Sequence, residues 1–171
     1  IRAVMNEHVD EHMVKPAMVY ISNATEIGTV YTKAELKALR DVCDEYGLLL
    51  YMDGARLPMA LVANDSDLGL ADLAKYFDVC YLGGTKCGAL FGEAVVIFND
   101  ALKQNFRFSV KQQGAMLAKG RLLGLQFSVL FEENRYLDLA DHAVKMAQKL
   151  QEGMEQEGIS FFVKTTTNQI F

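Results

Sequence analysis

Four short apolar runs alternate with stretches of helical periodicity, and this alternation limits the possible folds more than any other feature of the chain. The runs cover residues 18–22, 48–52, 79–82 and 94–98. Each run is continuously apolar, which is typical of a strand in a parallel sheet with both faces covered. The pattern therefore predicts an α/β fold with three layers, α/β/α, around a mostly parallel sheet.

Start and stop signals place the helices between and after these runs. Thr32 and Glu35 have capping-box spacing, and Gly47 supplies a stop, so we expect a helix between them. A shorter helical stretch lies around residues 72–77. From residue 101 the chain reads as helical, with long helices over 116–131 and 136–157, and Gly158 ends the second. The apolar run 159–163 predicts a further strand.

Bulk properties exclude several classes of function. The 17 basic and 22 acidic residues give a net charge of −5 with no basic stripe, which argues against nucleic acid as a partner. No apolar run approaches the roughly 18 residues of a membrane span, and the first residues lack the layout of a signal peptide. Three cysteines without metal-ligand spacing favour the reducing cytoplasm. The chain starts at Ile1 and ends in a strand-like run, so we expect a piece of a longer protein.

Polar clusters follow three of the predicted strands, at the edge where parallel α/β sheets bind ligands. Asp53 directly follows the predicted strand at residues 48–52. Lys86 follows Gly83, Gly84 and Thr85 after the predicted strand at residues 79–82. Taken singly, Asp53 reads as a turn or capping carboxylate and Lys86 as a solvated loop lysine. Taken together, they supply an amine that can hold an aldehyde and an acid that can keep a pyridine nitrogen protonated. In such a pocket we expect the lysine amine to lose solvation.

Three segments resemble a known family, the threonine aldolases and β-eliminating lyases. The run YMDGARL at residues 51–57 resembles the family's MDGARL signature, and GGTKCGA at 83–89 resembles its lysine segment. The run ISNATEIGTVY at 21–31 is similar to the loop that precedes them. The resemblance covers nearly the whole chain. It implies the large domain of an aspartate-aminotransferase-like enzyme that uses pyridoxal 5'-phosphate (PLP).

The resemblance also implies roles for individual residues. Lys86 matches the lysine that forms a Schiff base with PLP, and Asp53 matches the partner of the pyridine nitrogen. Arg56 matches an arginine beside the cofactor that helps to hold the substrate carboxylate, a task suited to its planar fork. Thr85 is counted with these cofactor-binding residues. Thr25 and Glu26 lie in a loop that faces the site, without an assigned role.

Weaker signals have two readings each. The basic cluster Arg107, Lys111, Lys119 and Arg121 loosely resembles a region that contributes to the phosphate site, with a dimer interface as one setting for it, and solvated helix charge explains the cluster nearly as well. His8 and His12 have the spacing of metal ligands, yet no third ligand is evident, so we expect no metal site. Cys87 borders Lys86 and reads as a small packing residue.

The reaction that the resemblance implies is cleavage of a β-hydroxy-α-amino acid, such as threonine or allo-threonine, to glycine and an aldehyde. β-Elimination or transamination with the same cofactor, or a non-catalytic fragment of such an enzyme, stay open as alternatives. No residue is identified as the base that deprotonates the β-hydroxyl.

Family members are longer at both ends and supply the ring-stacking and phosphate-binding residues from outside this chain. We therefore expect residues 1–158 to be the central part of the large domain and 159–171 to begin a C-terminal small domain. By analogy we expect a homodimer or homotetramer.

Overall fold

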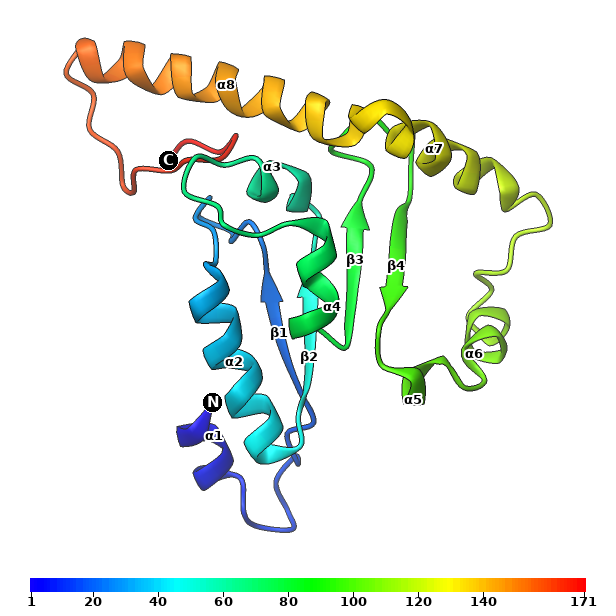
Figure 1. Ribbon diagram of the computed structural model, residues 1–171. Coiled ribbons are helices and arrows are strands. Elements are labelled where there is room, and N and C mark those ends of the chain that lie inside the picture. Colours follow the sequence, from blue (N-terminus) through cyan, green and yellow to red (C-terminus); the bar gives the residue numbers. More distant parts are fainter.

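A four-stranded sheet is the central feature of the computed structural model, which describes all 171 residues (Figure 1). The strands lie side by side in sequence order: β1 (Met18–Ser22), β2 (Leu49–Asp53), β3 (Val79–Gly83) and β4 (Glu93–Ile97). The first three strands are parallel, and β4 runs antiparallel to β3. The predicted α/β fold with a mostly parallel sheet is confirmed, and each strand lies within one residue of its predicted position.

Eight α-helices and two short 3-10 turns complete the chain. They are α1 (Arg2–Glu7), α2 (Lys33–Tyr46), α3 (Leu57–Leu61), η1 (Leu70–Asp72), α4 (Leu73–Tyr76), α5 (Asp100–Lys103), α6 (Phe106–Gln112), α7 (Arg121–Phe131), η2 (Glu132–Asn134) and α8 (Arg135–Gln156). None of these helices combines the length and the apolar character that a membrane crossing requires.

The signals that place α2 act as predicted. The Thr32 hydroxyl accepts a hydrogen bond from the Glu35 backbone N–H at 3.3 Å, and the Glu35 carboxylate accepts one from the Thr32 N–H at 2.8 Å. Gly47 ends the helix in the left-handed region, at φ 64°. Leu36 and Cys43 on the inner side of α2 are completely buried, so this helix is anchored to the core on one face only.

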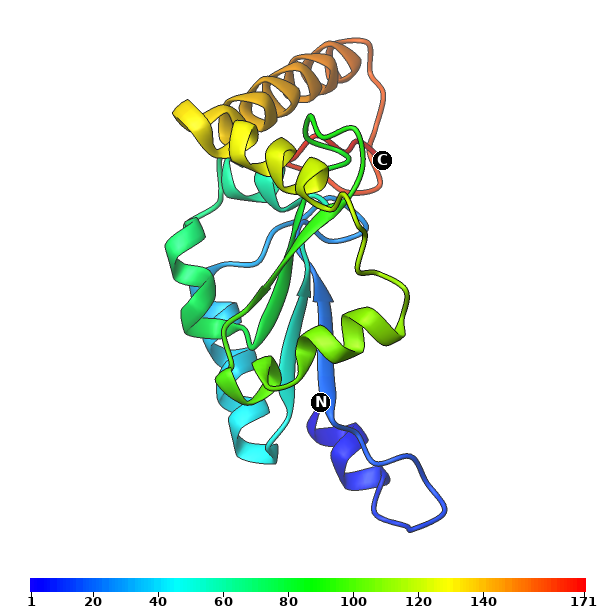
Figure 2. The ribbon, with the colours of Figure 1, turned by 90° about the vertical axis from the view of Figure 1, so that its right-hand side faces the viewer.

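The hydrophobic core lies between one face of the sheet and helices α2 and α4 (Figure 2). Side chains alternate along a strand, and Leu50, Met52 and Cys80 point to this covered face with no exposed surface. The opposite face is open in this chain, where Tyr20 is 54% exposed and Val95 53%. The continuously apolar strands predicted that both faces of the sheet are covered. They do not reveal which part of a protein supplies each covering layer, and in this chain only one face is covered.

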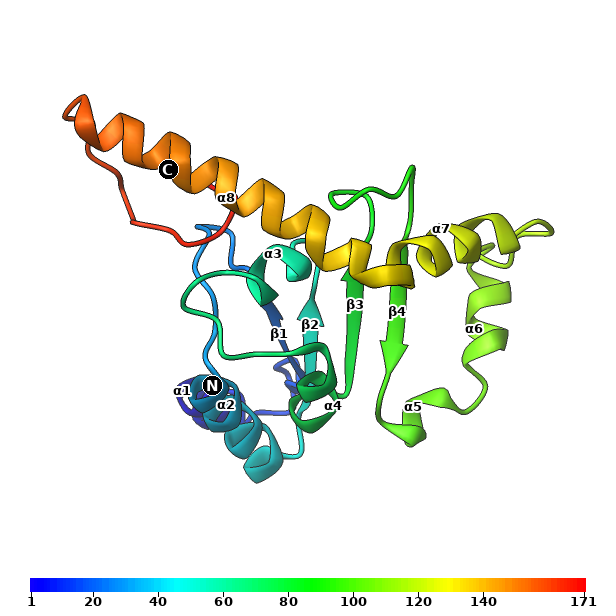
Figure 3. The same cartoon turned by 45° about the horizontal axis from the view of Figure 1, so that its top comes forward.

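Helix α8 crosses the carboxyl-end edge of the sheet and packs on α3 (Figures 1 and 3). The tail after α8 turns back beneath it, and Gln148 donates hydrogen bonds from its side-chain amide to the carbonyl oxygens of Thr165 and Thr167. The Thr167 hydroxyl donates to the Gly28 carbonyl at 2.9 Å. The division of the chain at residue 158 stays a prediction.

The strand predicted at residues 159–163 is wrong. This segment has no neighbouring strand, and its one backbone bond to the chain end joins the Phe162 N–H to the Phe171 carbonyl at 2.9 Å. A β-rich run forms a strand only where another strand supplies the hydrogen-bond ladder.

Candidate functional site

Asp53 ends β2 at the carboxyl edge of the sheet, directly beside Ser22 of β1. It lies two residues after Tyr51, so both side chains project from the open face. Its Oδ1 atom accepts a hydrogen bond from the Ala55 backbone N–H at 3.0 Å, and its Oδ2 atom accepts one from the Tyr20 hydroxyl. Both carboxylate oxygens are therefore held by donors from within the chain.

The surroundings of Asp53 favour its charged form. Partial burial alone would raise the pKa of this carboxyl, but hydrogen bonding from Tyr20, Tyr81 and the Ala55 N–H, together with the charge of Lys86, brings the pKa below its ordinary value. Donation to Asp53 raises the pKa of Tyr20 to about 12. Tyr20 is thus a neutral donor, and Asp53 a carboxylate, near neutral pH.

Lys86 lies in the loop between β3 and β4, whose two ends are both tied down. At its start the Gly84 N–H donates to the Glu93 carboxylate. At its far end the Gln126 amide of α7 accepts from the Leu90 N–H at 2.6 Å and donates to the Phe91 carbonyl at 3.2 Å. Helix α7 therefore holds the lysine loop against the edge of the sheet.

A buried tyrosine holds the same loop from α8. The Tyr136 hydroxyl donates to the Gly83 carbonyl at 2.9 Å, and the Cys87 thiol donates to the Tyr136 carbonyl at 3.2 Å. Burial raises the pKa of the Cys87 thiol to about 11, so this residue is a poor nucleophile and a packing residue, as expected.

The Lys86 side chain itself is exposed and takes part in no hydrogen bond or ion pair within the chain. The sequence predicted an amine that loses solvation in a pocket, and these 171 residues do not supply that pocket. The reason is that the open face of the sheet and the loop above it are not covered by another layer of this chain.

Two glycines bring the Asp53 and Lys86 loops into contact. The Gly83 N–H donates to the Gly54 carbonyl at 2.9 Å. A Cβ atom on Gly83 would lie 2.6 Å from the same Gly54 oxygen, and one on Gly54 would collide with the Tyr81 carbonyl. Only residues without a side chain allow the two backbones to come this close. The two candidate residues paired from the sequence are therefore brought to one edge of the sheet.

Arg56 is the N-cap residue of α3, and its Nη1 atom lies 3.8 Å from the Glu26 carboxylate. Thr25 is bound within its own loop, since its hydroxyl lies 2.7 Å from that of Thr29. Glu26 is the more exposed partner of the ion pair and remains accessible at the site. The exposed Thr85 hydroxyl donates to the Gly92 carbonyl at 3.4 Å, beside Lys86 in sequence.

The four residues of the basic cluster do not lie at the edge of the sheet where the Asp53 and Lys86 loops meet. Arg107 and Lys111 lie on α6, Lys119 lies in the turn before α7, and Arg121 is the first residue of α7; both helices extend beyond the β4 edge (Figure 1). The two N-terminal histidines are bonded separately, His8 to the Val14 carbonyl and His12 to Asp10. No group of three His, Cys, Asp or Glu side chains is placed to hold a metal ion.

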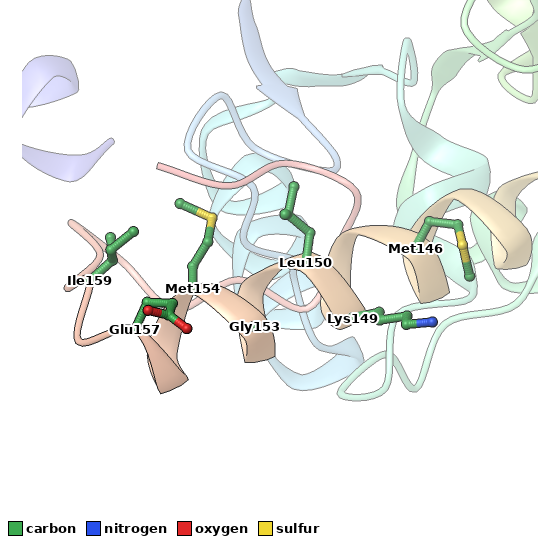
Figure 4. A pocket seen from close by; sticks show the side chains of 7 residues that line it. All are labelled: Met146, Lys149, Leu150, Gly153, Met154, Glu157 and Ile159. Atoms are coloured by element: carbon green, nitrogen blue, oxygen red, sulfur yellow. The ribbon is translucent and has the colours of Figure 1, made fainter.

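A mostly apolar groove of about 490 Å³ lies elsewhere, along the last turns of α8 (Figure 4). Its lining includes Met146, Leu150 and Met154, together with the charged Lys149 and Glu157. It combines no acid, base and nucleophile, so we do not place chemistry there.

Tyr20, Gln126 and Tyr136 are site residues that the sequence reasoning missed. Tyr20 belongs to a different strand from Asp53, and only the β1–β2 register, with Tyr20 beside Tyr51, shows that its hydroxyl can reach the carboxylate. Gln126 and Tyr136 act across more than thirty residues of chain and carry no local signal.

The residues present fit PLP at two points. An ionised carboxylate at a strand end can accept a hydrogen bond from a protonated pyridine nitrogen. An amine without an internal ion-pair partner, on the adjoining loop, is free to react with an aldehyde.

Several known proteins are similar to this chain in sequence or in fold. The sequence is 36% identical to a low specificity L-threonine aldolase of Pseudomonas aeruginosa over 172 residues, covering all of this chain and 50% of that protein. A low specificity L-threonine aldolase of Escherichia coli O157:H7 is 28% identical and is covered to 47%. The chain thus spans about half the length of the curated relatives it matches.

A solved structure of Leishmania major threonine aldolase matches 99% of this chain, with a TM-score of 0.97 and 49% identity, and is itself covered to 50%. An aspartate aminotransferase structure from Thermus thermophilus, at 15% identity and a TM-score of 0.64, shares the fold. The sequence model described as beta-eliminating lyase matches residues 1–171. The chain belongs to the beta-eliminating lyase family.

Proposed function

We propose that this chain is the central part of a PLP-dependent lyase that cleaves β-hydroxy-α-amino acids, such as threonine or allo-threonine, to glycine and an aldehyde. The observation that carries the proposal is the meeting of the Asp53 and Lys86 loops at Gly54 and Gly83. The names of the relatives, low specificity L-threonine aldolases, support the aldol reaction over other PLP chemistry.

Each candidate residue has a task in this proposal. Lys86 would hold PLP through Nζ, the amine that can react with the cofactor's aldehyde. Asp53 would accept a hydrogen bond from the ring nitrogen and keep it protonated, because an adjacent carboxylate stabilises a charged pyridinium. Arg56 binds the substrate carboxylate, and Thr85 contributes a hydroxyl beside Lys86. When bound, PLP supplies the electron sink that takes up the electron pair of the broken Cα–Cβ bond.

The wider setting belongs to the same proposal. We infer a cytoplasmic homodimer or homotetramer, in line with three buried free thiols and an open sheet face. Residues 1–158 form the central part of a large domain, and 159–171 begin a small one. A longer chain would supply the layer that covers Lys86.

The proposal is tested by the visible absorption spectrum of the chain with PLP, before and after borohydride. We expect a band that borohydride fixes to the protein, present in the unsubstituted chain and in Lys15→Ala, and absent in Lys86→Ala. Lys15 is a matched control because it is also exposed and takes part in no ion pair. A band fixed equally in Lys86→Ala would contradict the assignment of Lys86.

Product analysis on a chain extended at both ends tests the reaction itself. Glycine and acetaldehyde from threonine are the expected products, whereas ammonia and a keto acid would indicate elimination. We expect the 171-residue chain alone to bind PLP weakly and to turn over little, and normal turnover by it would overturn that view.

A further inference from the structure

Tyr20 approaches Asp53 from the neighbouring strand. Its register partner is Tyr51, two residues before Asp53 on β2, and the two rings stack with centroids 5.4 Å apart and planes 9° from parallel. The stacking restrains the plane of the Tyr20 ring, and its hydroxyl donates to Asp53 Oδ2. A side chain with only two rotatable bonds is thus held at both ends, by its ring and by its hydroxyl.

The carboxylate keeps room for a further donor. Two oxygens offer about four acceptor positions. One is taken by the Ala55 N–H on Oδ1 and one by Tyr20 on Oδ2. Tyr81 is a third donor to this carboxylate, so one acceptor position remains for a further bond. With a donor on each oxygen the carboxylate plane has little freedom to turn.

We propose that Tyr20 is a positioning residue for Asp53: its hydroxyl fixes the direction of the carboxylate and favours its charged form, and Asp53 then receives the ring nitrogen of PLP in a preset orientation. This inference rests on the proposed function. Electrostatics agree with it, because the Tyr20 hydrogen bond is the largest of the influences that lower the pKa of Asp53 against the opposing effect of burial. Since the pKa of Tyr20 is about 12, its hydroxyl keeps its proton throughout the neutral range.

Tyr51 offers a matched control. It belongs to the same aromatic row, but its hydroxyl takes part in no hydrogen bond within the chain. Tyr51→Phe and Tyr20→Phe each delete a single oxygen from neighbouring stacked rings, and only the second removes a donor from Asp53.

The first readout needs no cofactor. The carboxyl pKa of Asp53 is measured by ¹³C NMR on the full chain, with folding checked at each pH by circular dichroism. We expect the pKa to rise in Tyr20→Phe, because a donor to the charged form is lost, and to stay unchanged in Tyr51→Phe. A pKa that is the same in all three chains overturns the inference.

The second readout is the binding of PLP as a function of pH. A higher Asp53 pKa means that the carboxylate is neutralised sooner on acidification, so the acid limb of binding should move to higher pH in Tyr20→Phe only. At neutral pH we expect about tenfold weaker binding from the loss of a hydrogen bond to a charged group. In an Asp53→Asn background, Tyr20→Phe should cause no further loss, because Tyr20 acts through Asp53.

The outcomes separate the two proposals. If the unsubstituted chain and its extended form bind no PLP, the proposed function is wrong, and the role of Tyr20, which depends on it, is wrong as well. If PLP binds normally to Tyr20→Phe with the same pH profile as the unsubstituted chain, the role of Tyr20 fails and the proposed function stands.

Discussion

At the scale of single residues, the closeness of two backbones decides whether the candidate site can form. Gly54 faces the Tyr81 carbonyl so closely that a Cβ atom has no room, and its own carbonyl receives the Gly83 N–H. The contact is with backbone, which has no rotamer by which to move aside. This steric limit explains why a glycine follows Asp53.

We predict that Gly54→Ala lowers the free energy of unfolding by about 1–3 kcal/mol, the usual cost of overpacking a tight contact. The midpoint of urea denaturation measures this change. An unchanged midpoint would show that the Asp53 and Lys86 loops can separate without cost, against the geometry described above.

At this scale the sequence singles out Asp53 and Lys86 because each follows a strand, and the family resemblance adds Arg56. It did not find Tyr20, because the reach from Tyr20 to Asp53 depends on the strand register, which apolar runs do not encode. It also predicted a desolvated lysine, whereas Lys86 is exposed, because solvation depends on surfaces outside the local segment.

At the scale of elements, Asp78 ties together the amino-terminal edge of the sheet. Its carboxylate accepts hydrogen bonds from the Leu50 N–H, the Arg40 guanidinium and the Asn99 amide, each at 2.8 Å. The Arg40 and Asp78 side chains are only 17% and 15% exposed. One side chain thus connects α2, β2 and the turn after β4.

We predict that Asp78→Asn costs about 3 kcal/mol at neutral pH, since it removes the buried partner of the Arg40 charge and leaves only the exposed Asp44 carboxylate, 2.7 Å away. Burial opposes the shift, but the bonds from Leu50, Asn99 and Arg40 bring the pKa of Asp78 below its ordinary value. Its stabilisation is therefore complete above the unfolded pKa of about 3.9 and is lost as pH falls through the lower folded pKa.

Urea denaturation at several pH values tests this sign. The difference between the two chains should shrink on acidification below about pH 4. Asp41→Asn, which affects an exposed pair with Lys37, is the control and should leave the midpoint unchanged. A difference that grows in acid would contradict the prediction.

Helix α8 contains a glycine that no contact requires. A Cβ atom on Gly153 would meet nothing within 4 Å, in contrast to Gly54. We predict that Gly153→Ala stabilises the chain by up to about 1 kcal/mol, because alanine is the better helix former. A raised midpoint of thermal unfolding would support this prediction. A lowered midpoint would contradict it and would show that an added methyl group does not fit at this position.

The bounds of a helix or strand could be predicted where residues within a few positions of its ends determine them. The capping box at Thr32 and the stop at Gly47 both act within four residues, and the bounds of α2 follow from them. The direction of β4 was not predictable, because an apolar run fits parallel and antiparallel neighbours alike. The strand prediction for residues 159–163 is wrong for a related reason, because this β-rich segment has no partner strand beside it.

At the scale of the whole molecule, a bound cofactor should stabilise the fold that holds it. At a hundredfold excess over its dissociation constant, a ligand contributes about 2.7 kcal/mol. For a chain of this size that corresponds to a rise of about 5–10 °C in the melting temperature. We predict such a rise with PLP, measured by differential scanning fluorimetry, and a smaller one in Lys86→Ala. Equal rises in both chains would contradict covalent attachment at Lys86.

The order of the strands in the sheet has a consequence for how the chain acquires its structure. The strands β1 to β4 lie side by side in the order of synthesis. Each strand can therefore pair with the edge of the strand that precedes it in the sequence, without inserting between two strands that are already paired. The long-distance contact is different, since Thr167 reaches Gly28 across 139 positions of sequence. Closing so large a loop is slow relative to local pairing. The tail should therefore dock last, onto a sheet and an Asp53–Lys86 edge that are already assembled.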